Sequence, residues 1–199
     1  MDNENRQQDF SLEKLRQGDR AEFARLVEAY SPLIYRLGLK MLNNPQDAED
    51  ILQETFIKAY QHLGDFDGRS SPATWLYRIA TNEALMSLRK KRPELISLEE
   101  PLSDTSQPQE PMQILDWCCL PEEDYLTAES LEALDRSIDA LPASLRIVFV
   151  LRDIQGLSTR EVAEILDLSE TAVKTRLSRA RLRLRELLTT YFGDILSER

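Results

Sequence analysis

Aromatic and basic side chains gather in one stretch of the chain, residues 66–92. It begins with a polar run and continues with Ser71 and Pro72, which are typical of a helix start, because serine caps exposed N–H groups and proline is tolerated in the first turn. The predicted helix ends in the basic run 89–92. Aromatic faces stack on unpaired bases and cations follow phosphates, so the stretch suits single-stranded nucleic acid. A core helix whose basic end faces solvent explains this stretch equally well.

A second pattern lies near the C-terminus. Ser158 and Glu161 have the spacing of a capping box, which predicts a short helix over 160–166. A brief turn with Asp167, where glycine is often found, leads to Ser169 and a long helix to about residue 188. This is the spacing of a helix-turn-helix. A plain helical hairpin is the alternative, but the stretch 169–185 has six basic residues against Glu170 alone, which favours DNA.

The net charge of −10 argues against a nucleic-acid partner until its distribution is considered. Residues 1–92 hold 14 basic and 14 acidic side chains, and residues 128–199 hold 11 and 12. Residues 93–127 hold 9 acidic and no basic side chains. The excess acidity therefore lies in the middle segment, and the basic stretch of the C-terminal part is a local footprint for phosphates.

Apolar residues recur at helical spacing through 11–42 and 45–61, with Pro32 predicting a kink or a new helix start and Asn44 and Pro45 another start. The segment 93–127 is rich in proline and too polar for a core. We therefore expect an all-α protein: a helical domain at 1–92, an acidic flexible linker at 93–127 and a helix-turn-helix domain at 128–199. The linker is long enough for the domains to sit far apart. Its Trp117-Cys118-Cys119 run has no assigned role.

Several classes of function are disfavoured. No apolar run approaches the ~20 residues that span a membrane, and the start is polar, so we expect a cytoplasmic protein without membrane insertion. The adjacent cysteines and the single His62 do not have zinc-site spacing. There is no glycine-rich phosphate loop and no arrangement of a nucleophile with a base. We expect no metal, cofactor, small-molecule substrate or enzymatic activity.

Four stretches in order carry a family resemblance: DAEDILQETFIKAY, FDGRSSPATWLYRIATNEALMSLRKKR, LPASLRIVFVLRDIQGLS and STREVAEILDLSETAVKTRLSRARLRLRELL. Together they resemble a bacterial RNA polymerase sigma factor of the extracytoplasmic-function group, within the housekeeping sigma family. The resemblance implies a protein that binds core polymerase, recognises the −35 element as duplex and the −10 element as melted DNA, and directs transcription initiation at a specific set of promoters.

The resemblance also implies three sets of site residues. The polymerase-binding set, on the clamp helices of the largest subunit, is Asp47, Asp50, Gln53 and Glu54. The −10 set is Phe66, Gly68, Trp75, Arg78, Asn82, Arg89 and Lys90, of which Trp75 could equally be a core residue. The −35 set is Ser158, Arg160, Lys174, Thr175, Arg176, Ser178 and Arg179.

The family makes an anti-sigma factor an expected partner, and it implies that the acidic linker passes through the polymerase and mimics nucleic acid there; a solvated tether is an equal alternative. A stand-alone helix-turn-helix regulator is the main competing function. Such regulators usually dimerise, and no dimer seam is evident in the sequence. A helical scaffold whose basic helix binds an acidic protein is another alternative.

Overall fold

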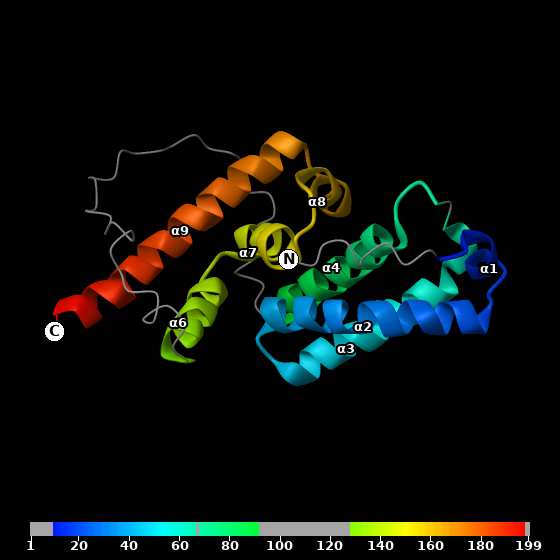
Figure 1. The fold of residues 1–199 in the computed structure, drawn as a ribbon, viewed down its shortest axis with the longest axis horizontal. Coiled ribbons are helices and arrows are strands. Elements are labelled where there is room, and N and C mark those ends of the chain that lie inside the picture. Colours follow the sequence, from blue (N-terminus) through cyan, green and yellow to red (C-terminus); the bar gives the residue numbers. More distant parts are fainter. Residues whose placement is uncertain (1–9, 67, 92–127, 198–199) are drawn as a thin grey trace.

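The computed structural model describes residues 10–66, 68–91 and 128–197. Every regular element within these residues is a helix, so the expected all-α class is confirmed (Figure 1). In chain order the elements are α1 (Leu12–Arg16), α2 (Arg20–Leu42), α3 (Pro45–Gln61), the 3-10 turn η2 (Leu63–Asp65), α4 (Pro72–Lys91), α6 (Ala128–Asp139), α7 (Ala143–Phe149), the π-helical turn η5 (Val150–Ile154), α8 (Thr159–Leu166) and α9 (Glu170–Ser197).

Local capping explains where the helices begin and end. The side chain of Asn44 accepts a hydrogen bond from the N–H of Asp47 and Pro45 opens α3, as the sequence predicts. Asp167 ends α8 with a φ of 54°, the left-handed conformation that glycine often supplies in this turn. Pro32, in contrast, neither ends nor restarts α2, which is continuous through it. Buried side chains on both sides of Pro32 hold the helix in place despite the missing N–H.

The N-terminal half is built on α2, α3 and α4, which lie side by side (Figure 1). Their apolar side chains form the core between them. Leu26, Ile34, Leu37 and Leu76 are fully buried there. Gly38 brings α2 close to α3, because a Cβ at this position would lie only 3.1 Å from the Cα of Ala48. A larger residue at position 38 would push the two helices apart.

The C-terminal half places α8 and the first turns of α9 as a helix-turn-helix supported by α6, α7 and η5. Ile147, Val162 and Val173 are fully buried and join these helices to the main core. A second cluster of Ile138, Leu141, Ala180 and Leu184 packs α6 against α9. The long α9 therefore has a supported N-terminal part that presents its outer side chains in a fixed orientation.

The two halves pack against each other rather than lying far apart. The main hydrophobic cluster includes residues of both halves. Arg146 of α7 donates from Nη1 to the carbonyl of Met41 at the end of α2, over 3.0 Å, and also to the carbonyls of Asp139 and Leu141. One guanidinium thus donates hydrogen bonds to backbone carbonyl groups at the C-terminal ends of two helices, α2 and α6.

The predicted linker 93–127, with Trp117-Cys118-Cys119, lies outside the described residues. Among the helices that the structure describes, none is both long and apolar enough to cross a bilayer.

Candidate nucleic-acid interface

The polar loop before α4 is shaped by a stacked aromatic pair. The rings of Phe66 and Trp75 have their centroids 4.8 Å apart at an interplanar angle of 25°. Phe66 is only 4% exposed, and Trp75 packs against the main core while remaining half-buried. Gly68 has a φ of 76°, which favours glycine. The rings of Phe66 and Trp75 therefore stack on each other, and this pair holds the start of the loop against α4.

Helix α4 presents one buried and one exposed face. Leu76, Tyr77, Ala80 and Ala84 point into the core. The opposite face exposes four of the predicted −10 residues: Arg78, Asn82, Arg89 and Lys90. Arg78, Asn82 and Arg89 follow helical spacing and form a polar strip, which shares its side of the helix with the exposed Met86 and the buried Leu85. Lys90 lies beside this strip.

The first residue of this strip contacts the helix-turn-helix. Arg78 donates from Nη2 to the backbone carbonyl of Glu164 in α8 over 2.7 Å, and the carboxylate of Glu164 lies 3.7 Å from the same nitrogen. The carbonyl bond fixes the direction of the guanidinium. In this arrangement Arg78 is turned towards α8.

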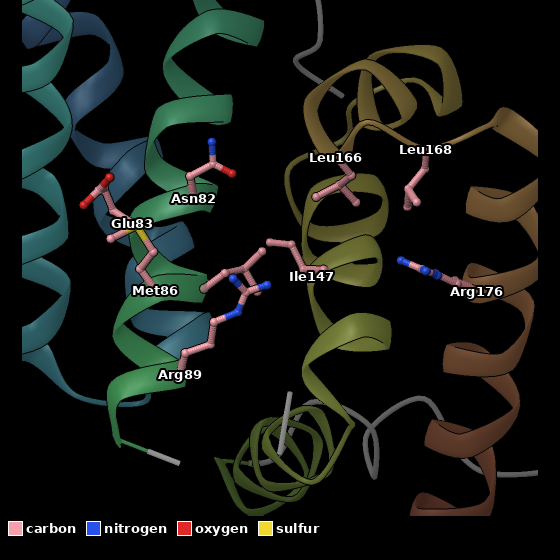
Figure 2. A pocket seen from close by; sticks show the side chains of 9 residues that line it. Asn82, Glu83, Met86, Arg89, Ile147, Leu166, Leu168 and Arg176 are labelled. Atoms are coloured by element: carbon pink, nitrogen blue, oxygen red, sulfur yellow. The ribbon is translucent and has the colours of Figure 1, made fainter. Parts of the chain in front are cut away.

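A cavity of about 530 Å³ separates α4 from the helix-turn-helix. Three residues predicted to contact DNA line it: Asn82 and Arg89 from the −10 set and Arg176 from the −35 set (Figure 2). Figure 2 shows α4 on one side of the cavity and α9 on the other, with Ile147 between them. The remaining lining residues include Leu166 and Leu168 of the turn region. The tertiary structure thus brings parts of two predicted DNA-binding faces together, which the sequence did not predict.

The remaining predicted −35 residues lie at the start of α8 and along α9. Ser158 accepts a hydrogen bond from the N–H of Glu161, and the Glu161 carboxylate accepts one from the N–H of Ser158, so the capping box is confirmed. The other members are exposed or half-buried: Arg160, Lys174, Thr175, Ser178 and Arg179. The Thr175 hydroxyl donates to the carbonyl of Thr171 within the helix.

Two arginines of the basic stretch have acidic partners inside the chain. Arg181 makes a bidentate pair with Asp153 of η5 at 2.8 and 2.9 Å, and this hydrogen bonding raises the pKa of Arg181. Arg183 pairs with Glu186 one turn further along α9. These ion pairs occupy two of the six basic side chains in 169–185. Fewer of these side chains are therefore available to phosphates than the sequence indicates.

The predicted polymerase-binding residues lie on α3. Asp50, Gln53 and Glu54 are exposed on its outer side, whereas Asp47 is half-buried and forms an ion pair with Lys91, the last residue of α4, at 2.5 Å. Lys91 was not in any predicted set. Its partnership with Asp47 ties the basic end of α4 to the start of α3.

Two apolar residues extend this exposed face of α3. Ile57 is 50% exposed and Tyr60 is 46% exposed, with the Tyr60 ring set edge-on against Phe23. Tyr60 lies within the apolar pattern of 45–61, which predicts a core position for it, and Ile57 is in none of the predicted site sets. The spacing of Ile57 from Gln53 and Glu54 by four and three residues was the available signal, because such residues share a helix face.

In the part of the chain that the structure describes, no group of three or more histidine, cysteine, aspartate or glutamate side chains is arranged to hold a metal ion.

A helix-turn-helix, together with a helix that exposes basic and polar residues after a glycine-containing loop, matches the arrangement expected of a sigma-type promoter-recognition protein. The family models agree: sigma-70 region 2 matches residues 26–94 and sigma-70 region 4 matches residues 131–184. The chain belongs to the extracytoplasmic-function sigma factors, and its function is promoter recognition. This is a family of initiation factors rather than enzymes.

Curated relatives cover most of the chain. It is 38% identical to the ECF RNA polymerase sigma factor SigW of Bacillus subtilis, over 89% of this chain and 94% of that protein. It is 34% identical to the RNA polymerase sigma-H factor of Pseudomonas aeruginosa, over 85% and 88%. It is 33% identical to the ECF RNA polymerase sigma-E factor of Escherichia coli K12, over 85% and 88%.

Two solved structures have a similar fold. CnrH, in complex with the cytosolic domain of CnrY, aligns with a TM-score of 0.66 at 25% identity, over 90% of this chain and 95% of that one. The sigma factor RpoE of Bartonella quintana, in complex with the anti-sigma factor NepR, aligns with a TM-score of 0.62 at 25% identity, over 84% and 97%.

Proposed function

We propose that this sigma factor binds core RNA polymerase and reads promoters with two separate elements of its fold. The loop before α4 and the exposed strip of α4 hold the melted −10 strand, and α9 reads the −35 element as duplex. The observation that carries this assignment is the two-faced character of α4, which buries Tyr77 and Ala80 and exposes Arg78, Asn82 and Arg89. The exposed face of α4 offers charged and hydrogen-bonding groups next to a loop held by an aromatic pair, which is the chemistry that a melted strand requires.

On the −10 side, each predicted residue has a distinct task. A flipped base enters the loop beside Gly68, whose positive φ sets the course of the loop backbone. Arg78 and Asn82 supply hydrogen-bonding groups for base edges, and Arg89 and Lys90 bind phosphates. Phe66 and Trp75 support the loop from beneath, because their faces already stack on each other.

On the −35 side, the first three turns of α9 enter the major groove. Lys174 and Arg179 are exposed cations five residues apart, and Thr175, Arg176 and Ser178 share this part of the helix. Arg160 and Ser158 at the start of α8 contact the phosphate backbone. Helix-turn-helix proteins place the N-terminal part of the second helix against base edges in this way.

On the polymerase side, Asp47, Asp50, Gln53 and Glu54 bind the clamp helices of the largest subunit. The exposed carboxylates of Asp50 and Glu54 suit a basic partner, and the neighbouring exposed Ile57 and Tyr60 add apolar contact area.

The two reading elements separate when the protein engages a promoter. Asn82, Arg89 and Arg176 line one cavity, and Arg78 is bonded to α8, so this arrangement cannot place all of them on two spaced promoter elements at once.

The domains are 1–92 and 128–199, and the linker 93–127 spans them and follows the RNA exit path. The protein has no catalytic activity of its own and works in the cytoplasm.

An anti-sigma factor is a partner of this chain. CnrH and the Bartonella quintana RpoE, which share its fold, were solved in complexes with CnrY and NepR respectively.

The function is tested by transcription from a library of genomic fragments with bacterial core polymerase, with and without the chain. We expect transcripts that depend on the chain and start downstream of two spaced sequence elements. If no transcript depends on the chain while the chain alone shifts a specific duplex, it acts as a stand-alone regulator and the proposal fails.

A further inference from the structure

The short helix α1 (Leu12–Arg16) lies before both matched family regions, which cover residues 26–94 and 131–184. It nevertheless contacts the loop that precedes α4. A segment that belongs to neither matched region but touches the proposed base-binding loop requires an explanation. The role inferred for α1 rests on the proposed −10 function of that loop.

Helix α1 is anchored firmly on α2. The N–H of Ser11 donates to Oε1 of Glu22 over 2.8 Å, and Glu22, only 5% exposed, also pairs with Arg25 at 2.8 Å. Leu15 is 1% exposed within the main core. A buried carboxylate with two partners and a buried leucine give α1 a defined position, although a helix of this length is unstable by itself.

From this position α1 contacts the loop at two points. Arg16 donates from Nε to the backbone carbonyl of Phe66 over 2.7 Å. The side chain of Leu12 lies against Gly68, since a Cβ on Gly68 would come within 2.9 Å of its Cδ1 atom. The ring of Phe66 is meanwhile stacked on Trp75 of α4. The loop is therefore held by α1 through its backbone and by α4 through the ring of Phe66.

We propose that α1 sets the geometry of the base-capturing loop, and that Arg16 is a positioning residue for recognition of the flipped −10 base. The guanidinium fixes the carbonyl of Phe66, and Leu12 packs against Gly68, so these two positions of the loop are held in place before the base arrives. A base is captured only if the pocket exists when it leaves the stack, because flipping has a cost that an unformed pocket does not offset. Small displacements of such a pocket have large effects on rate.

This role predicts where the effect of a substitution falls. Arg16→Ala leaves polymerase binding through α3 and −35 binding through α9 unchanged, because α1 contacts neither proposed surface. It slows open-complex formation, and it weakens discrimination between the preferred base and other bases at the flipped position. A role in stability alone would lower all activities together and leave the base preference intact.

The experiment uses the full chain assembled with core polymerase on a promoter found in the library above. Initiation rates are measured on that promoter and on variants with each base replaced in its −10 element, and base flipping is followed with 2-aminopurine at the captured position. For Arg16→Ala we expect a roughly 10- to 100-fold slower rate on the preferred promoter and a reduced ratio between preferred and replaced bases. Arg16→Lys should recover part of the rate, and Leu12→Ala should show the same defect in weaker form.

Arg20→Ala is the matched control, because it removes an exposed arginine four residues away in α2. If wild-type protein supports no transcription, the proposed function itself fails. If wild-type protein is active and Arg16→Ala behaves as Arg20→Ala, the inference about α1 is overturned. It is also overturned if Arg16→Ala reduces polymerase affinity and −35 binding as much as initiation, or if the base preference is unchanged.

Discussion

The phenol of Tyr77 donates a hydrogen bond of 3.0 Å to the side-chain oxygen of Gln155, 78 residues further along the chain. Both residues are buried, and Nε2 of Gln155 reaches the carbonyl of Leu33 at 3.4 Å. A single side chain directly after η5 is therefore bonded to both α4 and α2. This buried polar contact orients the C-terminal half on the N-terminal half, since polar groups away from water need specific partners.

Tyr77→Phe should destabilise the protein by about 1 kcal/mol, because it removes one buried hydrogen bond while keeping the ring. Urea unfolding followed by circular dichroism measures the change in the free energy of unfolding. Tyr60→Phe is the matched control, since that ring is 46% exposed, and we expect less than about 0.5 kcal/mol there. Equal effects of the two substitutions would show that the Tyr77–Gln155 bond contributes nothing specific.

A covalent link across the cavity should block promoter opening. Met86→Cys and Leu168→Cys place thiols on α4 and in the turn between α8 and α9, both lining the cavity, and Cys118 and Cys119 are first replaced by serine. After treatment with a reducible bifunctional thiol reagent, we expect at least a tenfold loss of initiation, reversed by reductant, because the two reading faces are held together. The single-cysteine variants, treated in the same way, serve as controls. Normal initiation by the cross-linked protein would show that separation is not required.

Lys174→Ala should weaken binding of the holoenzyme to a −35 duplex and reduce the salt dependence. Each cation that neutralises phosphate charge at the interface contributes about one to the slope of log K against log salt, so losing Lys174 should lower the slope by up to about one. Arg183→Ala removes the same charge from the same helix, but Arg183 pairs with Glu186, so its effect should be small. Titration of a fluorescent −35 duplex at several salt concentrations provides the measurement. A larger slope change for Arg183→Ala than for Lys174→Ala would place the reading face elsewhere.

Ser158 has a capping role and a proposed phosphate contact, and two substitutions separate them. Ser158→Ala should lose about 1 kcal/mol of stability, because Glu161 loses its capping partner, and it should bind the −35 duplex less well. Ser158→Asp retains a side-chain acceptor for the cap but adds a negative charge. We expect it to restore stability in thermal unfolding while −35 affinity falls further. If Asp restores both properties, Ser158 does not lie beside a phosphate.

Glu22 should make the anchoring of α1 dependent on pH. The hydrogen bond from the N–H of Ser11, assisted by Arg25, lowers the pKa of Glu22 below its ordinary 4.5, against the opposing effect of burial. A carboxyl group with a depressed folded-state pKa contributes stability that is fully present above its unfolded pKa and is lost as the pH falls through the folded value. Glu22→Gln should therefore be less stable than wild type at pH 7, and the difference should shrink below about pH 4.5. Unfolding curves from pH 7 to pH 3 test this, and a constant difference would contradict it.

Much of the local structure is predictable from the sequence, because capping acts within one turn. Ser158 with Glu161, and Asn44 with Pro45, mark helix starts that the structure confirms. Asp167 occupies the left-handed turn position as expected. The all-α class and the sigma-factor function follow from such local signals and from the order of the motifs.

Contacts between distant residues were decided only by the tertiary structure. The stacking of Phe66 on Trp75, the bond from Arg16 to Phe66 and the exposure of Tyr60 depend on how helices far apart in sequence dock, and periodicity does not encode that docking. The length of the linker 93–127 is compatible with two domains that lie far apart. The buried hydrogen bond between Tyr77 and Gln155 instead joins the N-terminal half to the C-terminal half. The sequence by itself determined the helices and the chemistry of their surfaces, because both depend on neighbouring residues. Which of those surfaces face each other was determined by burial of apolar area and pairing of buried polar groups across the whole fold.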